Sequence, residues 1–498
     1  MSAPGLDRAF FGHPRGLSTL FFTEMWERFS YYGMRALLIL FMTAAPAAGG
    51  LGFDTATAGA IYGLYTAMVY MTSLPGGWIA DRLIGARRAV LYGGVLISAG
   101  HFSMAFPAIE TFYLGLVLIV IGTGLLKGNV SVIVGRLYAP DDDRRDAGYS
   151  IFYMGINTGA FVAPLVCGYL GQRVNWHLGF AAAGVGMILG LVQYMLGARY
   201  LGDAGLHPAN AGSAAEQARW RAQALRWTSV AAAALLAGGI GIATGVWPVT
   251  ASQVADAGGA LLLLSTIAFF GWLFLSPGWT PDERKRLSLI AVLFLAAALF
   301  WSAFEQAGST LNLFADRDTD NRVLGWEFPS SFYQSLNSLF IIFGLAPAFA
   351  WLWVFLARRR LEPSSSSKFG IGLILVGAGF VVMVGAATLS AQGIKVSPWW
   401  LFVTYFLHTA GEMALSPVGL SAMSKLAPER IGGLVMGVWF LAASVGNYIG
   451  GRLGGLYESW PLPRLFGAVA AFSIVIGIAL LLMARRFRGL AGAGPAEA

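Results

Sequence analysis

Fourteen mostly apolar stretches run through the sequence, each close to the roughly 20 residues that a helix needs to cross a bilayer. They cover about 17–45, 56–80, 88–107, 111–138, 146–170, 177–200, 225–246, 257–275, 288–312, 331–356, 369–390, 399–426, 431–455 and 463–486. Only 12% of the residues are charged, about half the fraction of an average soluble domain. This scarcity excludes a soluble enzyme and a disordered protein, and the single cysteine excludes a disulfide scaffold. The sequence therefore predicts an all-α membrane protein.

The distribution of basic residues predicts how the spans are oriented. If the amino terminus is cytoplasmic, 24 of the 33 lysines and arginines fall on the cytoplasmic side, six on the outer side and three within spans. An even number of spans then places both termini in the cytoplasm. The first span contains charges and lacks a cleavage site, so we expect it to be retained. Because the basic residues are scattered between spans, the net charge of +8 does not indicate a nucleic-acid partner.

Two of the stretches, 225–246 and 257–275, carry no charge in their interiors and divide the remaining twelve into two groups of six. We therefore expect a six-helix bundle over 1–200, an inserted two-helix hairpin with its linkers over 201–287, and a second six-helix bundle over 288–498. Paired bundles of this kind are typical of transporters that bind their substrate near the membrane midplane, between the two halves.

Seven acidic and basic residues, histidines aside, lie inside the predicted spans and away from their ends. They are Glu24, Glu27, Arg28, Arg35, Lys127, Glu305 and Glu412. A charge inside a membrane costs several kcal/mol, so such residues usually line a pathway or a paired site. The set has one excess acid, and a single proton would neutralise it. The alternative interpretation is that the charges pair and only hold helices together.

The charges of the first span share one face. At about 100° per residue, the four charged residues of this span and Tyr31 fall within one arc, with Tyr32 at its edge. Such a stripe cannot face lipid and must face the bundle interior. In a cavity there, the basic side chains could bind a carboxylate and the acidic side chains could bind an ammonium, while aromatic side chains would line the cavity. A zwitterion such as an amino acid or short peptide fits this set better than a neutral sugar or a nitrate-like anion.

Other chemistry has no support in the sequence. The phosphate-binding motif GxxxxGK[ST] is missing, which disfavours ATP-driven transport, and neither HExxH nor a cysteine cluster indicates a metal. We expect no metal and no cofactor, with protons as the coupling ion.

Three sequence motifs carry a resemblance to a known family. Residues 24–33 read EMWERFSYYG and fit the motif ExxERFxYYG. Residues 76–82 read GGWIADR, with Gly85 and a basic pair following, and residues 152–161 read FYMGINTGAF. In these motifs, and along its whole length, the chain resembles the proton-coupled oligopeptide transporters, a branch of the major facilitator superfamily. The two extra spans resemble the inserted helix pair of bacterial members.

The resemblance implies a major facilitator fold of 14 spans, two six-helix bundles plus two inserted helices. It implies a symporter in the bacterial inner membrane that imports di- and tripeptides with protons by alternating access. The protein would work as a monomer, with peptides, protons and membrane lipid as its partners.

The resemblance also assigns roles to matching residues. Proton coupling would involve Glu24, Glu27, Arg28, Arg35 and Glu305. The peptide carboxylate would bind Arg28 and Lys127, near Tyr31, Tyr32 and Tyr70; its amino terminus and backbone would bind Asn157, Asn337 and Glu412; and Trp301, Trp439 and Phe440 would shape the side-chain pockets. Gating would involve Asp81 and Arg82 and the pairs Arg35–Glu305 and Lys127–Glu412.

Two departures qualify these roles. Gly128 stands where many relatives have proline, so this helix can bend differently, and the span 56–80 has no histidine, so carboxylates must carry the proton. Alternatives remain: a relative that carries nitrate, another anion or an amino-acid conjugate, a proton-coupled drug exporter, or a receptor that does not transport. Glu412 and the intact first motif argue against a nitrate carrier. The presence of sites for both signs of charge argues against a drug exporter, and the retained proton-coupling residues argue against a receptor that does not transport.

Overall fold

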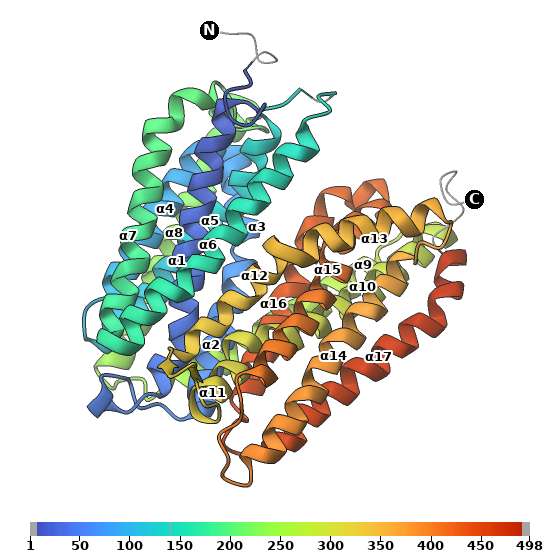
Figure 1. Cartoon of the computed structure of the whole chain (residues 1–498). Helices are drawn as coiled ribbons and strands as arrows, with labels where there is room; N and C mark the ends of the chain where they lie inside the picture. Colours follow the sequence, from blue (N-terminus) through green and yellow to red (C-terminus); the bar gives the residue numbers. More distant parts are fainter. Residues whose placement is uncertain (1–6, 140, 491–498) are drawn as a thin grey trace. The chain divides into compact units, whose positions relative to one another are not determined.

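The computed structural model describes residues 7–139 and 141–490 and is almost entirely helical (Figure 1). The first half contains α1 (Arg15–Thr43), η1 (Pro46–Ala48), α2 (Thr55–Met71), α3 (Ser73–Ile79), η2 (Ala80–Ile84), α4 (Ala86–Met104), α5 (Ile109–Gly135), α6 (Arg145–Tyr169), η3 (Leu170–Val174), α7 (Trp176–Gly197), η4 (Ala198–Leu201) and α8 (Ala214–Ala243). Here η2 directly follows α3 along the chain, and η3 directly follows α6.

The second half begins with α9 (Ala251–Leu275), α10 (Pro281–Phe304), η5 (Glu305–Gly308) and α11 (Thr310–Arg317), and then forms a short hairpin of β1 (Arg322–Val323) and β2 (Trp326–Glu327). It continues with η6 (Ser330–Gln334), α12 (Ser335–Phe340), η7 (Ile341–Leu345), α13 (Ala346–Arg358), α14 (Ser365–Ser390), α15 (Trp399–Leu426), η8 (Glu429–Leu434), α16 (Val435–Gly454) and α17 (Leu462–Leu490). Over the described residues these elements make fourteen long helical segments, as the sequence predicts.

Nine of the described segments are long and apolar enough to cross a membrane by length and composition alone. The first segment, α1, is not one of them, because its middle carries charged side chains. Those side chains are buried: Glu24, Glu27 and Arg28 are 3%, 0% and 4% exposed. The charged face of α1 therefore packs inside the protein, as the sequence predicts.

Local sequence signals set several helix ends. Ser213 and Thr280 begin α8 and α10 with reciprocal capping boxes, in which the glutamate three residues later bonds back to the cap. The hairpin of β1 and β2 pairs Arg322 with Glu327 in antiparallel register. Its turn places Leu324 and Gly325 at positive φ, as a two-residue hairpin turn requires.

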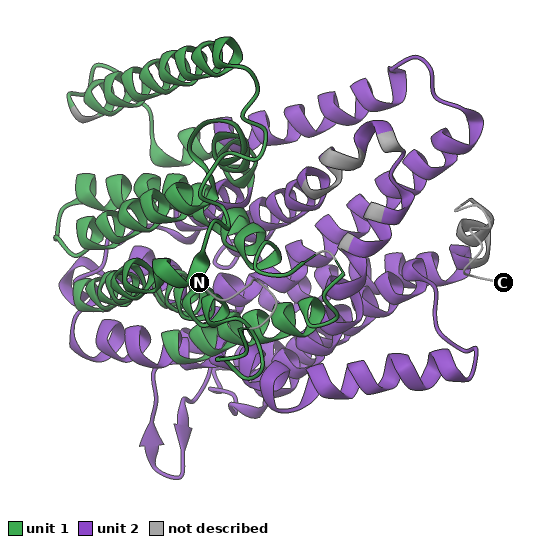
Figure 2. Cartoon of the chain, turned by 90° about the horizontal axis from the view of Figure 1, so that it is seen from above, with its two compact units in different colours: residues 1–34, 71–163, 177–256 green, residues 35–70, 164–176, 257–498 purple. Residues whose placement is uncertain are grey.

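The chain divides into two compact units, which Figure 2 colours separately. One unit comprises residues 1–34, 71–163 and 177–256, and the other comprises residues 35–70, 164–176 and 257–498. The boundary cuts α1 between Met34 and Arg35. The end of α1, α2 up to Tyr70 and the end of α6 thus belong to the unit that contains the carboxyl-terminal half. The predicted division at residues 200 and 287 stays a prediction.

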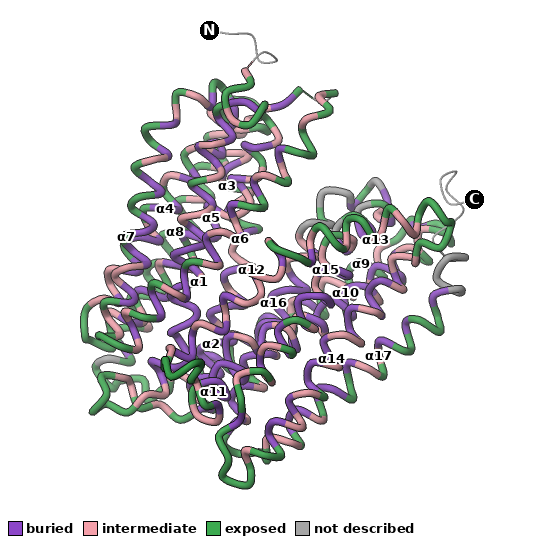
Figure 3. The backbone as a smooth tube through the Cα atoms, viewed as in Figure 1, coloured by how far each residue is buried: buried purple, intermediate pink, exposed green. Residues whose placement is uncertain are grey.

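Each unit has its own apolar interior, shown by the buried stretches in Figure 3. In the first unit, α1, α4, α5 and α7 contribute Leu17, Val90, Val130 and Met187 to one cluster. In the second unit, α14 lies beside α15 and α17, and α10 packs against α16.

Glycines allow α2 and α16 to pack backbone against backbone. A Cβ added at Gly59 would lie 2.6 Å from the Gly451 carbonyl oxygen and 2.5 Å from the Gly455 nitrogen. One turn along α2, a Cβ at Gly63 would lie 2.8 Å from the Tyr448 carbonyl oxygen. Small residues are the usual means of such close approach in membrane helices.

Candidate functional site

In the first unit, α1 holds one arginine between two carboxylates. The Arg28 Nε lies 3.1 Å from Glu24 Oε1, one helical turn away, and also pairs with Glu27. All three side chains are buried, and buried charges need such partners. When all three are ionised the cluster carries one excess negative charge. It can therefore take up a proton or release the guanidinium to another anion.

Two tyrosines continue this face of α1. The Arg28 guanidinium lies 5.5 Å from the centre of the Tyr31 ring, which packs edge to face against Tyr32 at 5.2 Å. Lys127 is half-buried on α5, and Asn157 is buried on α6, where its amide donates to the Tyr153 carbonyl at 3.0 Å. The first unit thus contains every predicted binding residue for a peptide carboxylate except Tyr70.

In the second unit, Arg35 pairs with Glu305, as predicted. Its Nε also donates a hydrogen bond of 2.8 Å to the hydroxyl of Tyr62 on α2. Arg35 and Glu305 are each 4% exposed, and Tyr62 is 1% exposed. The sequence analysis missed Tyr62, because only the packing of α2 on α1 distinguishes it from the other tyrosines of its span.

Glu305 lies at a break that the sequence analysis did not predict. The span expected over 288–312 is interrupted after Phe304 by the short 3-10 turn η5, and Ser309 leaves helical geometry at φ −125° and ψ −93°. Backbone groups released by the break find partners on neighbouring helices. The Tyr405 hydroxyl donates to the Ala307 carbonyl at 3.3 Å, for example. Broken helices of this kind occur at the binding sites of many transporters.

A second acidic position joins two other helices of the same unit. The Asn337 amide on α12 donates to Glu412 Oε2 on α15 at 2.8 Å and to Thr409 Oγ1 at 3.2 Å. The two predicted residues are thus brought together although they are far apart in sequence. Nearby elements supply the predicted aromatic groups: Tyr70 and Phe440 lie with ring centres 6.5 Å apart.

Two predicted aromatic residues have contacts of their own. Trp301 lies one turn before Glu305 on α10 and packs against Phe300 and Phe304. Trp439 on α16 packs so closely on α15 that a Cβ at Gly419 would overlap its ring.

The predicted gating residues at η2 contact α8. The Arg82 guanidinium lies 4.8 Å from the ring of Trp220 on α8 and 5.7 Å from that of Trp78. The Asp81 carbonyl oxygen accepts a hydrogen bond of 2.8 Å from the Asn210 backbone N–H. Sequence reasoning identified Asp81 and Arg82 but not Trp220, whose partner depends on how the linker after η4 folds back.

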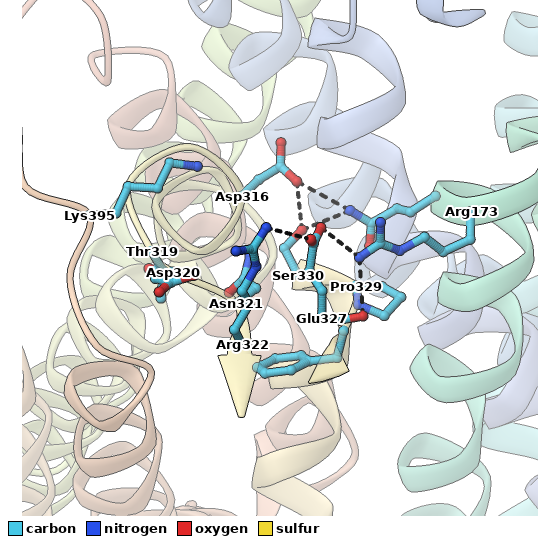
Figure 4. Close-up of a pocket in the computed structure, with 12 residues that line it drawn as sticks. Arg173, Asp316, Thr319, Asp320, Asn321, Arg322, Glu327, Pro329, Ser330 and Lys395 are labelled. Atoms are coloured by element: carbon cyan, nitrogen blue, oxygen red, sulfur yellow. Dashed lines mark hydrogen bonds and ion pairs between the residues drawn. The ribbon is translucent and has the colours of Figure 1, made fainter. Parts of the chain in front are cut away.

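A polar pocket of about 490 Å³ lies among the end of α6 with η3, the end of α11 and the β hairpin (Figure 4). Gln172 is central to it. Its amide nitrogen donates to Ser330 Oγ at 2.8 Å and Asp316 Oδ1 at 3.2 Å, and its oxygen accepts from the Ser331 backbone at 3.0 Å. These bonds tie the end of α6 to the segment after α11.

A second set of contacts closes the same pocket. Arg173 Nη2 binds Glu327 Oε1 at 3.0 Å, and Arg322 lies 3.3 Å from the other carboxylate oxygen (Figure 4). These two guanidinium groups lower the pKa of Glu327. The sequence analysis did not predict this cluster.

Comparison with known proteins identifies the family. The model of the POT family matches residues 87–468. The chain is 44% identical over 495 residues to the peptide transporter YePEPT of Yersinia enterocolitica, covering 97% of this chain and 96% of that one. It is 37% identical to a di-/tripeptide transporter of Lactococcus lactis subsp. cremoris, covering 98% of each chain.

Solved structures agree. A crystal structure of peptide transporter POT in complex with sulfate matches with a TM-score of 0.90 at 44% identity, over 97% of this chain and 96% of that chain. A POT family transporter in complex with 5-aminolevulinic acid matches with a TM-score of 0.88 at 36% identity, over 97% and 98%.

These matches confirm the predicted fold class, an all-α membrane protein with the major facilitator fold. They also confirm that the chain is a multi-pass membrane transporter and not an enzyme. The family model covers more than half of the chain, and its relatives align over nearly all of it. The chain belongs to the POT family.

Proposed function

We propose that this protein is a proton-coupled symporter that imports di- and tripeptides by alternating access. The observation that carries the proposal is the buried cluster of Arg28, Glu24 and Glu27. It holds a cation suited to a peptide carboxylate between two acids. Protonation of either acid weakens the attraction on the Arg28 guanidinium, which couples uptake of a proton to release of the arginine.

In the proposed cycle, the outward-open protein takes up a proton at Glu305, or at Glu24 or Glu27. Protonation weakens the pairing of that acid with its arginine, because the neutral carboxyl no longer attracts the guanidinium. The peptide carboxylate then binds Arg28 and Lys127. The two halves close around the peptide and open to the cytoplasm, and peptide and proton leave.

Glu412 would bind the peptide amino terminus. Its carboxylate is oriented by the Asn337 amide at 2.8 Å, which fixes the acid without supplying a cation. An incoming ammonium would provide that charge. The names of the relatives, peptide transporter and di-/tripeptide transporter, support this substrate class.

A second candidate substrate is an amino-acid-like zwitterion. A POT family transporter at 36% identity was solved in complex with 5-aminolevulinic acid, which carries both a carboxylate and an amine. The same charged residues suit such a molecule. Nitrate and cationic drugs each match only one sign of charge.

We further propose that the protein resides in the cytoplasmic membrane as a monomer, with both termini inside. The excess of lysines and arginines on one side of the spans supports this orientation. The mechanism needs protons as the coupling ion and no other cofactor.

Uptake of a labelled dipeptide into proteoliposomes tests the function. An imposed inward proton gradient should stimulate uptake in the wild type. Glu305→Gln should abolish the driven uptake but retain exchange of peptide across the membrane. If acidity outside does not stimulate uptake, the symport proposal is wrong. If driven uptake survives in the variant, Glu305 does not carry the proton. Unlabelled 5-aminolevulinic acid, nitrate and a cationic drug as competitors distinguish the alternative substrates.

A further inference from the structure

We propose that Tyr62 is a positioning residue for proton coupling, which holds Arg35 in place when Glu305 is protonated. The inference rests on the proposed function, because it assigns Glu305 the role of exchanging a proton. It adds Tyr62, which lies outside the three sequence motifs and on a different helix from both Arg35 and Glu305.

The geometry gives Arg35 two anchors at different atoms. Its Nη2 pairs with Glu305, and its Nε donates to the Tyr62 hydroxyl at 2.8 Å. The planar guanidinium presents five donors in fixed directions, so both contacts can exist together. All three residues are at least 96% buried, which leaves little water to substitute for either partner.

The backbone at the helix break is shaped around the phenol. A Cβ at Gly308, the last residue of η5, would overlap the Tyr62 hydroxyl and lie 2.9 Å from Arg35 Nε. Any other residue at this position would push the phenol or the guanidinium away. The same short turn thus presents Glu305 to Arg35 and makes room for Tyr62.

The two protonation states of Glu305 depend on Tyr62 to different degrees. With Glu305 ionised, Arg35 has a full counter-charge. With Glu305 protonated, Arg35 remains charged in a buried place, and the phenol oxygen still accepts from its Nε. Tyr62 therefore stabilises the protonated state more than the ionised one. Loss of its hydroxyl should make protonation of Glu305 require a more acidic solution.

Other titratable groups near Glu305 remain unchanged in the test. Glu412 on α15 interacts electrostatically with Glu305, and Tyr405 on the same helix interacts with Arg35, Tyr62 and Tyr333 of η6. On α16, which packs against η5, the titratable side chains are Tyr448 and Arg452. From α11, the uncharged Asn312 donates to the Ala36 carbonyl at 2.8 Å.

The test is Tyr62→Phe, which removes only the hydroxyl. We expect the pH of half-maximal proton-driven dipeptide uptake to fall by about one unit, a tenfold change in proton concentration. Peptide exchange at equal pH on both sides should persist. Tyr65→Phe, a buried tyrosine one turn along α2, is the matched control and should leave the pH profile unchanged. A wild-type pH profile for Tyr62→Phe, or an equal shift for Tyr65→Phe, overturns the proposal.

A second measurement separates this inference from the proposed function. Infrared difference spectra between acid and neutral pH report a protonated Glu305 carboxyl, assigned by the loss of its band in Glu305→Gln. The band should need about one pH unit more acid in Tyr62→Phe, whether or not transport is proton-driven. An unshifted band in a folded variant rejects the role of Tyr62 even if symport is established.

Discussion

The Asn337 amide donates a hydrogen bond of 2.8 Å to the Glu412 carboxylate and so joins α12 to α15 through two residues that lie 75 positions apart in the sequence. Because an amide carries no charge, the pair keeps an acid oriented without neutralising it. This arrangement suits an acid whose cationic partner arrives from solution.

Glu412→Gln should therefore change substrate choice more than overall activity. The variant keeps a side chain of the same shape but loses the negative charge. We expect uptake of dipeptides with a free amino terminus to fall about tenfold or more, with little change for N-acetylated dipeptides. Competition by the two peptide types against a labelled substrate measures the ratio. Equal losses for both would show that Glu412 does not recognise the ammonium.

Lys127→Ala should weaken dipeptide binding by about tenfold to a hundredfold, because a charge-assisted contact to the peptide carboxylate is lost. Titration calorimetry on the purified protein gives the dissociation constants. Lys285→Ala is the control, since this lysine is exposed and pairs only with Asp282 at 3.0 Å in the described structure. The role of Lys127 is refuted if both variants bind dipeptide as tightly as the wild type.

Gln172→Ala should loosen the end of α6. Gln172 makes contacts with Asp316, Ser330 and the Ser331 backbone, and the alanine variant loses all of them. Cys167, fully buried five residues earlier, is a natural reporter of this opening. We expect its labelling by a maleimide to be about a hundredfold faster, because three lost hydrogen bonds of roughly 1 kcal/mol each together favour opening by roughly 3 kcal/mol. Gln392→Ala changes an exposed glutamine and should leave labelling slow; equal rates in the two variants would contradict the role of Gln172.

His13, which lies just before α1, should make the stability of the protein against unfolding depend on pH. Its Nδ1 lies 2.9 Å from the Tyr138 hydroxyl, and burial, then the Arg144 charge, lowers its pKa. Asp142 has a pKa lowered to about 2 by its bonds to Arg144, and burial raises the pKa of Tyr138 to about 12, so neither titrates near neutrality.

The stability that His13 contributes is therefore present above its ordinary pKa of 6.5 and is lost as the pH falls below it, since the unfolded chain binds the proton more readily. The melting temperature in detergent should fall between pH 7.5 and 5.5, and His13→Gln should reduce that fall. An undiminished pH dependence in the variant would assign it to other groups.

Much of the fold was predictable because membrane insertion depends on local composition. The fourteen segments follow from apolar length, and the buried face of α1 follows from the spacing of Glu24, Glu27 and Arg28. Charged side chains in an apolar membrane span must face the protein interior, which leaves few possible orientations for the helix. The resemblance added the pairing of Arg35 with Glu305, which no local pattern specifies.

The parts that sequence reasoning missed depend on tertiary packing. Tyr62 is one of several tyrosines in its span, and only the contact between α1 and α2 selects it. Gln172 and Trp220 lie in unremarkable segments and gain partners from distant loops. No proline marks the break after Phe304, so the sequence gives no local signal of it. The break is stable because neighbouring helices form hydrogen bonds with the released backbone groups, as Tyr405 does with the Ala307 carbonyl.

The glycine contact between α2 and α16 has a mechanical consequence. A methyl group at Gly59 would lie 2.5 Å from the Gly455 nitrogen, far inside the roughly 3.5–4.0 Å at which atoms attract. Glycine at this position therefore lets the two backbones lie closer than any side chain would allow. A larger residue at Gly59 would force α2 and α16 apart, so the spacing of these two helices depends on a missing side chain.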